Sequence, residues 1–332
     1  MVKTRWFHDF VKEELPSNVS GRVFCITGTT SGTGYVVAKT AAQLGGEVVL
    51  LNRKSSRVST MLDNLKKEVP NGKFVTVECD LQNFASVKQA IQEIKSKYTA
   101  IYCLVNNAGI MATPDQATVD GYDTQMQTNH LSHFLLTAGL FPLLEAQANE
   151  TGDARVVHHS SKSRYMTKNK CLEEKYLQKN GGNLGGDGGS LYTLSGPAFE
   201  RYFHTKLAVS VFSHGLNEKL QAKQSKVRTI CADAGAADTT IGDEAIRKIT
   251  SCCLTKYCVP FFVQSAEDGT MGLLKAMMSP DAKSGTHYAP KGYKSLTGRP
   301  VEIQLKKYET DPDAVKMMWR NSEEATGITF DP

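Results

Sequence analysis

Short β-branched runs alternate with longer segments of helical periodicity along most of the chain. The expected strands are residues 22–27, 47–51, 73–78, 101–106, 155–160 and 226–232. The expected helices are residues 33–44, 57–69, 84–98, 120–146 and 198–220. Strands and helices that alternate in units of this length favour a parallel sheet with helices on both faces. The alternation therefore predicts an α/β fold, a doubly wound parallel sheet of about seven strands in a single domain.

Two segments interrupt this alternation. Residues 162–197 contain KNGGNLGGDGGS, which is too rich in glycine for a helix or strand, and residues 236–263 end in a mainly apolar run. Loops this long are functional or mobile, so we expect the insert at 162–197 to form part of a substrate lid together with residues 241–263 of the substrate-side segment 236–263. The alternative is a disordered surface excursion. The predicted organisation is an N-terminal extension at 1–20, the main domain at 21–300 and a C-terminal helical extension at 301–332.

Composition narrows the classes of partner. The 332 residues are 40% hydrophobic and 22% charged, which is typical of a soluble globular protein. The formal charge of +5 comes without a dense basic block, so nucleic acid is not expected as a partner, whereas a phosphorylated cofactor is compatible with it. The eight cysteines show no paired framework, which indicates a reducing intracellular compartment, either the cytoplasm or an organelle.

The first 16 residues have the pattern of a short amphipathic helix. They lack the apolar core of a secretory signal, and no segment of the chain has the apolar length of a membrane span. The apolar side chains of this helix pack on the domain or rest on a membrane surface, and packing is favoured.

A glycine-rich loop, TGTTSGTG, joins the first expected strand to the first helix. Glycines in this context let the backbone approach a pyrophosphate, which the helix N-terminus attracts. The predicted cofactor contacts in the loop are Thr27, Gly28, Thr30, Ser31, Gly32, Thr33 and Gly34. The second strand ends in Asn52 and Arg53, without the carboxylate that holds the ribose hydroxyls of NAD. Arg53 is suited to a 2′-phosphate, so we expect NADP(H) rather than NAD, with both residues among the cofactor contacts.

Tyr202 and Lys206 lie four residues apart, on one face of an expected helix. The spacing alone does not separate a proton-transfer site from a solvated helix face. For proton transfer, a neighbouring ammonium would lower the pKa of the phenol toward neutrality.

Six motifs in order resemble the classical short-chain dehydrogenase/reductase family. They are TGTTSGTG, Asp80-Leu81, NNAG at 106–109, Asn129 in TNHLSHFLLT, the serines that end RVVHHSS, and the Tyr202/Lys206 pair. The segments NHLSHFLLT, SAEDGTMGLLKAMMSPDAKSGTHYAPKGY and DAVKMMWRNSEEATG are similar to the retinol dehydrogenase and protochlorophyllide reductase branch. The resemblance implies a Rossmann-type sheet.

The resemblance also implies roles for individual residues. It makes Tyr202 the proton donor and Lys206 the residue that lowers its pKa. Ser161 would hydrogen bond to the substrate carbonyl, and Asn129 would complete a proton relay through water. Lys206 also holds the nicotinamide ribose, and Tyr202 borders the cofactor. Further cofactor contacts implied in this way are Asp80, Leu81, Asn107, Ala108, Gly109, Gly235 and Thr239. A homodimer, or a place as a subunit of a larger assembly, is left open.

The chain departs from the family pattern after the sixth strand, in CADAGAADTT. Ala234 stands where the family has proline, and Ala237 where it has valine, so the turn loses a fixed φ and bulk beside the nicotinamide. A metal site is not expected, because no histidine has a carboxylate or thiol partner at ligand spacing. A histidine base is not expected either, because His204 points away from Tyr202.

These observations predict an NADP(H)-dependent oxidoreductase that acts on CH–OH groups or carbonyls. The implied substrate is bulky and apolar, such as a retinoid, a steroid, a lipid aldehyde or a pigment precursor. The alternative from another class is a redox-inactive NADP-binding scaffold or sensor subunit of a larger assembly. A light-driven pigment reductase ranks lower, because the pigment-binding cysteine pattern is absent from the sequence.

Overall fold

The computed structural model describes residues 2–190, 193–238 and 263–332. Within them the strands form one eight-stranded sheet in the order β3-β2-β1-β4-β5-β6-β7-β8. All neighbouring strands are parallel except β8, which runs antiparallel to β7. The strands are β1 (Val23–Thr27), β2 (Glu47–Asn52), β3 (Lys73–Glu78), β4 (Cys103–Asn106), β5 (Ala154–Ser160), β6 (Val227–Asp233), β7 (His287–Pro290) and β8 (Pro300–Ile303).

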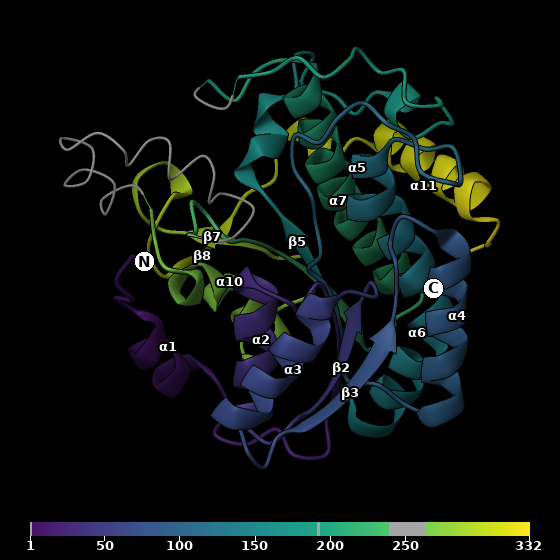
Figure 1. Cartoon of the computed structure of the whole chain (residues 1–332). Helices are drawn as coiled ribbons and strands as arrows, with labels where there is room; N and C mark the ends of the chain where they lie inside the picture. The colour runs from purple at the N-terminus through teal and green to yellow at the C-terminus, as the bar shows by residue number, and fades with distance from the viewer. Residues whose placement is uncertain (1, 191–192, 239–262) are drawn as a thin grey trace.

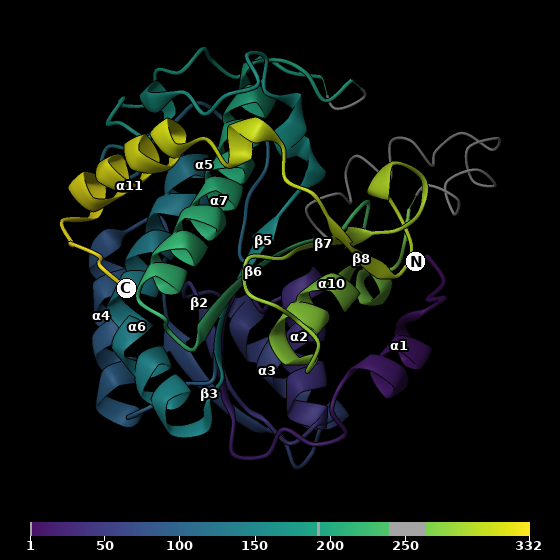
Figure 2. The same cartoon turned by 180° about the vertical axis from the view of Figure 1, so that it is seen from behind.

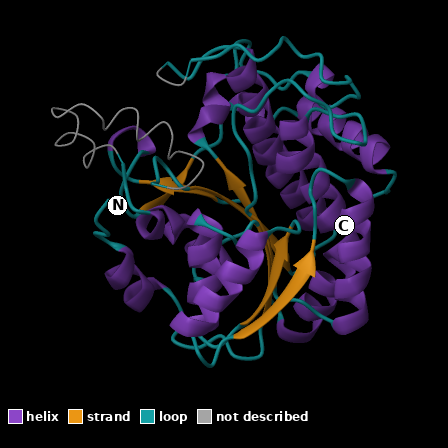
Figure 3. Ribbon diagram, in the orientation of Figure 1, coloured by secondary structure: helices purple, strands orange, loops and turns teal. Residues whose placement is uncertain are grey.

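Helices cover both faces of the sheet (Figure 1, Figure 3). One face carries α1 (Phe7–Glu14), α2 (Gly32–Gln43), α3 (Ser56–Glu68) and α10 (Ala266–Met278). The other face carries α4 (Phe84–Lys97), α6 (Ser132–Thr151), α7 (Pro197–Ala222) and α11 (Pro312–Thr326), as the view from behind also shows (Figure 2). The other elements of the described residues are short: α5 (Thr124–Met126), η1 (Gln127–Leu131), η2 (Lys162–Met166), η3 (Glu174–Tyr176), η4 (Tyr293–Ser295) and η5 (Lys307–Glu309).

Central strands bury side chains on both sides, which gives the domain two hydrophobic cores. In β1, Cys25 belongs to the core under α4, α6 and α7, and its neighbours Phe24 and Ile26 belong to the core under α2 and α10. Strands that are covered on both faces read as continuous apolar runs, which is why the sequence located them. The predicted doubly wound fold is confirmed. The expected strands included neither β7 nor the antiparallel edge strand β8, because each has only four residues, one of them a proline, and so carries little strand signal.

The expected helix at 120–146 is divided in the structure. It starts as α5, passes through the π-helical turn η1 and continues as α6. Such π turns are rare and occur often at functional sites, and η1 holds Asn129 at its centre.

The N-terminal helix α1 packs on α10. Asp268 of α10 accepts hydrogen bonds from the backbone N–H groups of Arg5, Trp6 and Phe7, at 2.9 to 3.0 Å, and so supplies partners for the start of α1. Phe10 is fully buried in the core beneath it. In the described part of the chain, no helix combines the length and apolar character needed to cross a bilayer.

The C-terminal helix α11 is fixed to α6 and α7 by a cluster of aromatic side chains. Trp319 stacks on Phe330 and meets Phe134 of α6 and Phe212 of α7 at centroid distances of 5.4 to 5.6 Å. Its indole N–H also donates to the Phe330 carbonyl at 3.1 Å. The extension is therefore part of the core on this face.

We expect Trp319→Ala to lower the free energy of unfolding by about 3–5 kcal/mol, because it removes a buried aromatic ring and leaves a cavity. Urea denaturation followed by circular dichroism measures the change. As a control, Val119→Ala removes an exposed apolar side chain and should cost less than about 0.5 kcal/mol. Equal small losses in both variants would contradict a core role for α11.

Candidate active site

The glycine-rich loop joins β1 to α2 by a turn that only small residues allow. Gly28 has φ +71°, and a Cβ on Gly34 would lie 2.2 Å from the Gly28 carbonyl oxygen. A Cβ on Gly28 would in turn lie 2.8 Å from the Cβ of Ala108 in the NNAG loop. The two loops therefore approach each other to contact distance at the carboxyl edge of the sheet.

Asn107 ties these loops together. Its side-chain amide donates to the Thr27 carbonyl at 2.9 Å and to the Gly28 carbonyl at 3.3 Å. Its side-chain oxygen accepts from the Thr33 hydroxyl at 2.9 Å. The Thr27 hydroxyl oxygen accepts from the N–H groups of Asn107 and Ala108, both at 3.0 Å. Thr33 thus has a structural partner in Asn107.

Asn52, at the end of β2, holds the other side of the glycine loop. Its side-chain oxygen accepts from the Thr29 N–H at 2.8 Å, and its amide donates to the Thr29 hydroxyl at 2.7 Å. The side chain is buried, whereas Arg53 next to it is exposed. Asn52 therefore shapes the pocket wall, and the charge beside it is that of Arg53.

A pocket opens at the carboxyl ends of the first strands. It brings together eight of the predicted cofactor residues: Gly28, Thr30, Asn52, Arg53, Asp80, Leu81, Ala108 and Gly109. The sequence analysis missed Arg57, the second residue of α3, which lines both this pocket and a second pocket that also contains Thr30. A second cation four residues after Arg53, at the start of an expected helix, was the available signal.

Asn129 connects the loop after β4 to helix α7. Its side-chain oxygen accepts from the Ile110 N–H at 2.8 Å, and its amide donates to the Ile110 carbonyl and to the Thr205 hydroxyl, both at 2.9 Å. Thr205 immediately precedes Lys206. The π turn thus places Asn129 between the cofactor-side loop and the Tyr202/Lys206 helix.

Ser161, Tyr202 and Lys206 lie where the end of β5 meets α7. The Ser160 hydroxyl donates to the Lys206 carbonyl at 2.9 Å, and the Lys206 ammonium donates to the His159 carbonyl, also at 2.9 Å. The ammonium nitrogen lies 5.9 Å from the centre of the Tyr202 ring. Ser161 caps the turn η2, and the hydroxyls of Ser161 and Ser163 both act to lower the pKa of the Tyr202 phenol.

Burial shifts the pKa values of both Tyr202 and Lys206. It raises the pKa of Tyr202, and the hydrogen bond with Ser161 offsets part of that shift. The predicted net lowering of this pKa is therefore wrong in this structure, because burial raises the pKa of the phenol and Lys206 is not among the groups that shift it. Burial also lowers the pKa of Lys206, to about 8.

The turn after β6 is held without the proline of the family pattern. Gly235 has φ +65°, and the Ala236 N–H donates to the Leu296 carbonyl at 2.9 Å. The Gln264 amide donates to the Ala234 carbonyl at 2.7 Å. These hydrogen bonds supply the restraint that Ala234 does not. The predicted contact Thr239, and most of the substrate-side segment 236–263, lie outside the described residues.

The glycine-rich insert is pinned to the loop after β4 over its described part. Arg201, which is fully buried, donates to the Gly186 carbonyl at 2.8 Å and to the Thr113 carbonyl at 2.9 Å. In return, Asp115 accepts from the N–H groups of Leu184 and Gly186 at 2.8 and 2.7 Å. These contacts order the segment beside Tyr202, and its role as a lid stays a prediction.

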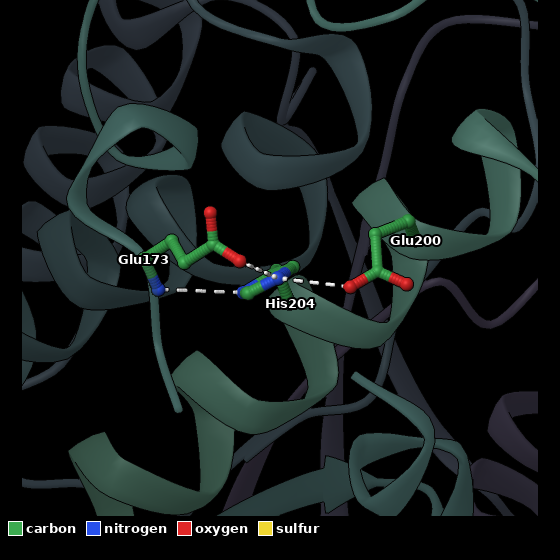
Figure 4. A group of neighbouring side chains, drawn as sticks. All are labelled: Glu173, Glu200 and His204. Carbon is green, nitrogen blue, oxygen red and sulfur yellow. Dashed lines mark hydrogen bonds and ion pairs between the residues drawn. The ribbon is translucent and has the colours of Figure 1, made fainter. Parts of the chain in front are cut away.

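His204 has two carboxylate neighbours, so the expectation that no histidine has one at ligand spacing is wrong (Figure 4). Its Nε2 lies 3.3 Å from Glu200, one turn earlier on α7, and 3.6 Å from Glu173 of the insert. Tyr176 stacks on the imidazole with centroids 4.0 Å apart.

The tautomer of His204 decides what this group holds. Nδ1 accepts from the Glu173 N–H at 3.4 Å, which places the proton of a neutral imidazole on Nε2, between the carboxylates. A metal on Nε2 would require a proton on Nδ1, opposed to that N–H, whereas metal-bound histidines donate from their second nitrogen. The geometry favours a shared proton that ties the insert to α7.

Comparisons with known proteins agree with this geometry. A family model described as short chain dehydrogenase matches residues 22–170. The chain is similar to human polyprenol dehydrogenase, with 27% identity over 92% of this chain and 86% of that protein. It is also similar to polyprenol dehydrogenase of Danio rerio, with 30% identity over 69% and 66% of the two chains.

Among solved structures, an uncharacterized protein from Mycobacterium paratuberculosis matches with a TM-score of 0.72 and 24% identity over the whole of both chains. A protein from Shigella flexneri, described as a short chain dehydrogenase complexed with NADP, matches with a TM-score of 0.59 and 19% identity. It covers 82% of this chain, and the match spans 97% of its own length. Identities this low establish the shared fold.

We expect Lys206→Met to increase stability at neutral pH by about 1–3 kcal/mol. With a pKa of about 8 in the folded state against an ordinary 10.5, the unfolded chain binds this proton more tightly, so the charged lysine costs stability below pH 8. The lost bond to the His159 carbonyl offsets part of the gain.

The advantage of the variant should shrink as pH rises above about 8, because the wild-type lysine then becomes neutral in the folded state. Urea unfolding at pH 7, 8, 9 and 10 measures it. Lys67→Met, on the exposed face of α3, should change stability by less than about 0.5 kcal/mol throughout. A variant less stable than wild type at pH 7 would show that the buried ammonium is not a cost.

Proposed function

The chain belongs to the short-chain dehydrogenase/reductase family of oxidoreductases, and we propose that it reduces a bulky apolar carbonyl compound, or oxidises the matching alcohol, with NADP(H). The observation that carries this proposal is the meeting of Ser161, Tyr202 and Lys206 at the edge of the sheet that also bears the glycine loop and its pocket.

The pocket fits a phosphorylated dinucleotide on three counts. The glycine loop leaves its backbone bare, since a Cβ on Gly28 or Gly34 would collide with neighbouring atoms. Two exposed arginines, Arg53 and Arg57, line the pocket and suit a 2′-phosphate. The side chain that ends β2 is Asn52, an amide that is engaged with Thr29. We infer NADP(H) over NAD from this charge pattern, and two related folds are described as complexed with NADP or NADPH.

The nicotinamide cofactor, when bound, supplies or accepts the hydride. The residues of the chain handle the proton and the oxygen of the substrate. Tyr202 donates its phenolic proton to the carbonyl oxygen as that oxygen becomes an alcohol, and Ser161 donates a hydrogen bond that positions it. A phenol whose pKa is raised stays protonated at neutral pH, which favours the direction of reduction.

Lys206 and Asn129 complete the group. The Lys206 ammonium gives one hydrogen to the His159 carbonyl and has two more donors for ribose hydroxyls. A Cβ on Gly109 would lie 3.5 Å from this nitrogen and 3.3 Å from the Asn129 oxygen, so the loop passes close to both groups. We propose that Asn129 holds this loop and relays the proton of Tyr202 through water.

An apolar substrate is supported by exposed side chains and by relatives. Met166, Leu194 and Tyr293 are exposed apolar residues in segments that follow β5, precede α7 and follow β7. These segments adjoin the carboxyl edge that holds Tyr202. Relatives from human, mouse and Danio rerio are named polyprenol dehydrogenase. An apolar alcohol of that class, or its aldehyde, heads the candidates, with retinoids, steroids and other lipid aldehydes beside it.

Tyr202→Phe should abolish turnover, with a fall of at least about 100-fold, because the proton donor is lost. NADPH oxidation is measured with a panel of apolar aldehydes and ketones, and NADPH binding is measured by fluorescence. Binding should change less than about threefold, since one hydroxyl beside the cofactor contributes little to its affinity. Tyr98→Phe removes a hydroxyl bonded to Glu47, at the opposite edge of the sheet, and should leave turnover unchanged. Undiminished turnover in Tyr202→Phe would refute its role, and NADPH binding without wild-type turnover would favour the scaffold.

Arg53→Ala and Arg57→Ala should each weaken NADPH binding by about tenfold, because each loses a charge-assisted contact to the 2′-phosphate. NADH binding should stay within about twofold, since NADH lacks that phosphate. Fluorescence titration with both nucleotides gives the ratio, with Lys67→Ala on α3 as the control. Equal losses for NADPH and NADH, or tighter binding of NADH by the wild type, would refute the assignment.

A further inference from the structure

A group of four charged side chains lies buried beside Ser161 without a role in the proposed reaction. Arg164, Asp233, His287 and Glu309 are each at most 2% exposed. The Arg164 guanidinium donates to both oxygens of Asp233, at 2.7 and 3.0 Å, and through Nε to Glu309 at 2.7 Å. His287 Nε2 lies 2.9 Å from Asp233.

The charges of this group balance. Burial opposes the charged form of Asp233, but Arg164 and His287 hold the pKa of that carboxyl far below its usual range. Burial and Arg164 act against a charge on His287, yet the contact with Asp233 raises the pKa of the imidazole to about 9. Two cations therefore face two anions at neutral pH.

The contacts of these residues join three segments that border Ser161 and Tyr202. Arg164 lies in η2, the turn that Ser161 caps, and Asp233 pairs with Ser160 across β5 and β6, two residues before Gly235. Glu309 also accepts from the Ser210 hydroxyl at 2.7 Å, and Ser210 is two turns after Tyr202 on α7. The network thus links the Ser161 turn, the turn after β6 and the Tyr202 helix.

We propose that Arg164 is a positioning residue: its guanidinium fixes the turn that carries Ser161 against the end of β6 and, through Glu309 and Ser210, against the helix that carries Tyr202. The proposal rests on the proposed function, because Ser161 and Tyr202 must share one carbonyl oxygen. Arg164 acts through the backbone that it holds and has no contact with substrate in this scheme.

Stability alone does not account for such a group. Burying an ion pair costs desolvation that the attraction often only repays, and apolar replacements are commonly as stable. A guanidinium bound to two carboxylates also fixes an orientation. Its three hydrogen bonds, 2.7 to 3.0 Å long, restrain the plane of the Arg164 guanidinium. A misplacement of about 1 Å in a catalytic group costs about 100-fold in rate, so a restraint here has a catalytic consequence.

Arg155 offers a matched control at the other end of the same strand. It is also buried, pairs with Asp153 at 2.9 Å and donates to the carbonyls of Ala276 and Ser279. It begins β5 whereas Arg164 follows its end, so it shares burial and pairing but lies at the edge away from Tyr202.

The test compares Arg164→Ala, Arg164→Lys and Arg155→Ala in the full chain. For Arg164→Ala we expect kcat to fall about 100-fold with NADPH affinity within about threefold, and added guanidinium ion at millimolar concentration to restore about tenfold. Arg164→Lys, which keeps charge but lacks the fork, should fall about tenfold. Arg155→Ala should lose thermal stability but keep kcat within about threefold, without rescue. Unchanged kcat in both Arg164 variants, or an equal fall in Arg155→Ala, would overturn the proposal.

Hydrogen exchange separates this proposal from the proposed function. In Arg164→Ala, exchange should increase in peptides 159–166 and 231–237 and stay unchanged in β1 to β3, whether or not the wild type turns over the carbonyl panel. In Arg155→Ala the increase should fall on 153–157 and 276–282. Unchanged exchange around Ser161 in Arg164→Ala would overturn the positioning role even if the enzyme is active. Absence of wild-type turnover with the expected exchange pattern would refute the function and leave the restraint supported.

Discussion

The site depends on how tightly the bare backbone of two loops meets at the edge of the sheet. The side-chain amide of Asn107 donates to two carbonyls of the glycine loop, and the Thr27 hydroxyl oxygen accepts from two N–H groups of the NNAG loop. With these groups satisfied, the loops need no side chains between them, and a Cβ on Gly28 or Gly34 would separate them. A parallel sheet with helices on both faces brings the two loops to the same edge. The alternation of strands and helices in the sequence therefore predicts where the pocket lies.

Sequence patterns predicted the features that depend on neighbouring residues, namely the strands and the spacing along one helix. The strands were visible because both of their faces are buried, and Tyr202 and Lys206 because helix geometry fixes a spacing of four. The grouping of Gly28, Asn52, Asp80 and Gly109 around one pocket followed from their positions at strand ends. Their roles toward a cofactor are carried by the family resemblance, and they stay proposals.

What the sequence did not predict depends on contacts between distant segments. Glu173 meets His204 only because the insert folds back on α7, and Arg57 lines the pocket only because α3 starts beside the glycine loop. The direction of the Tyr202 pKa shift was mispredicted for the same reason: the Lys206 neighbour is visible in the sequence, whereas the burial that raises this pKa is not. The π turn at Asn129 likewise has a sequence that reads as ordinary helix.

Charge burial links the active site to the end of the chain. Lys206 is held in a dry position that lowers its pKa, and Arg164 and His287 sit as cations in the same region, balanced by Asp233 and Glu309. Glu309 lies beyond the last strand, just before α11, and its segment is anchored by the aromatic cluster around Trp319. Without Glu309, Arg164 and His287 would share Asp233 as their only carboxylate in this group, so the C-terminal extension contributes to the charge balance there. The packing of Trp319 on α6 and α7 is therefore tied, through Glu309, to the placement of the turn that carries Ser161.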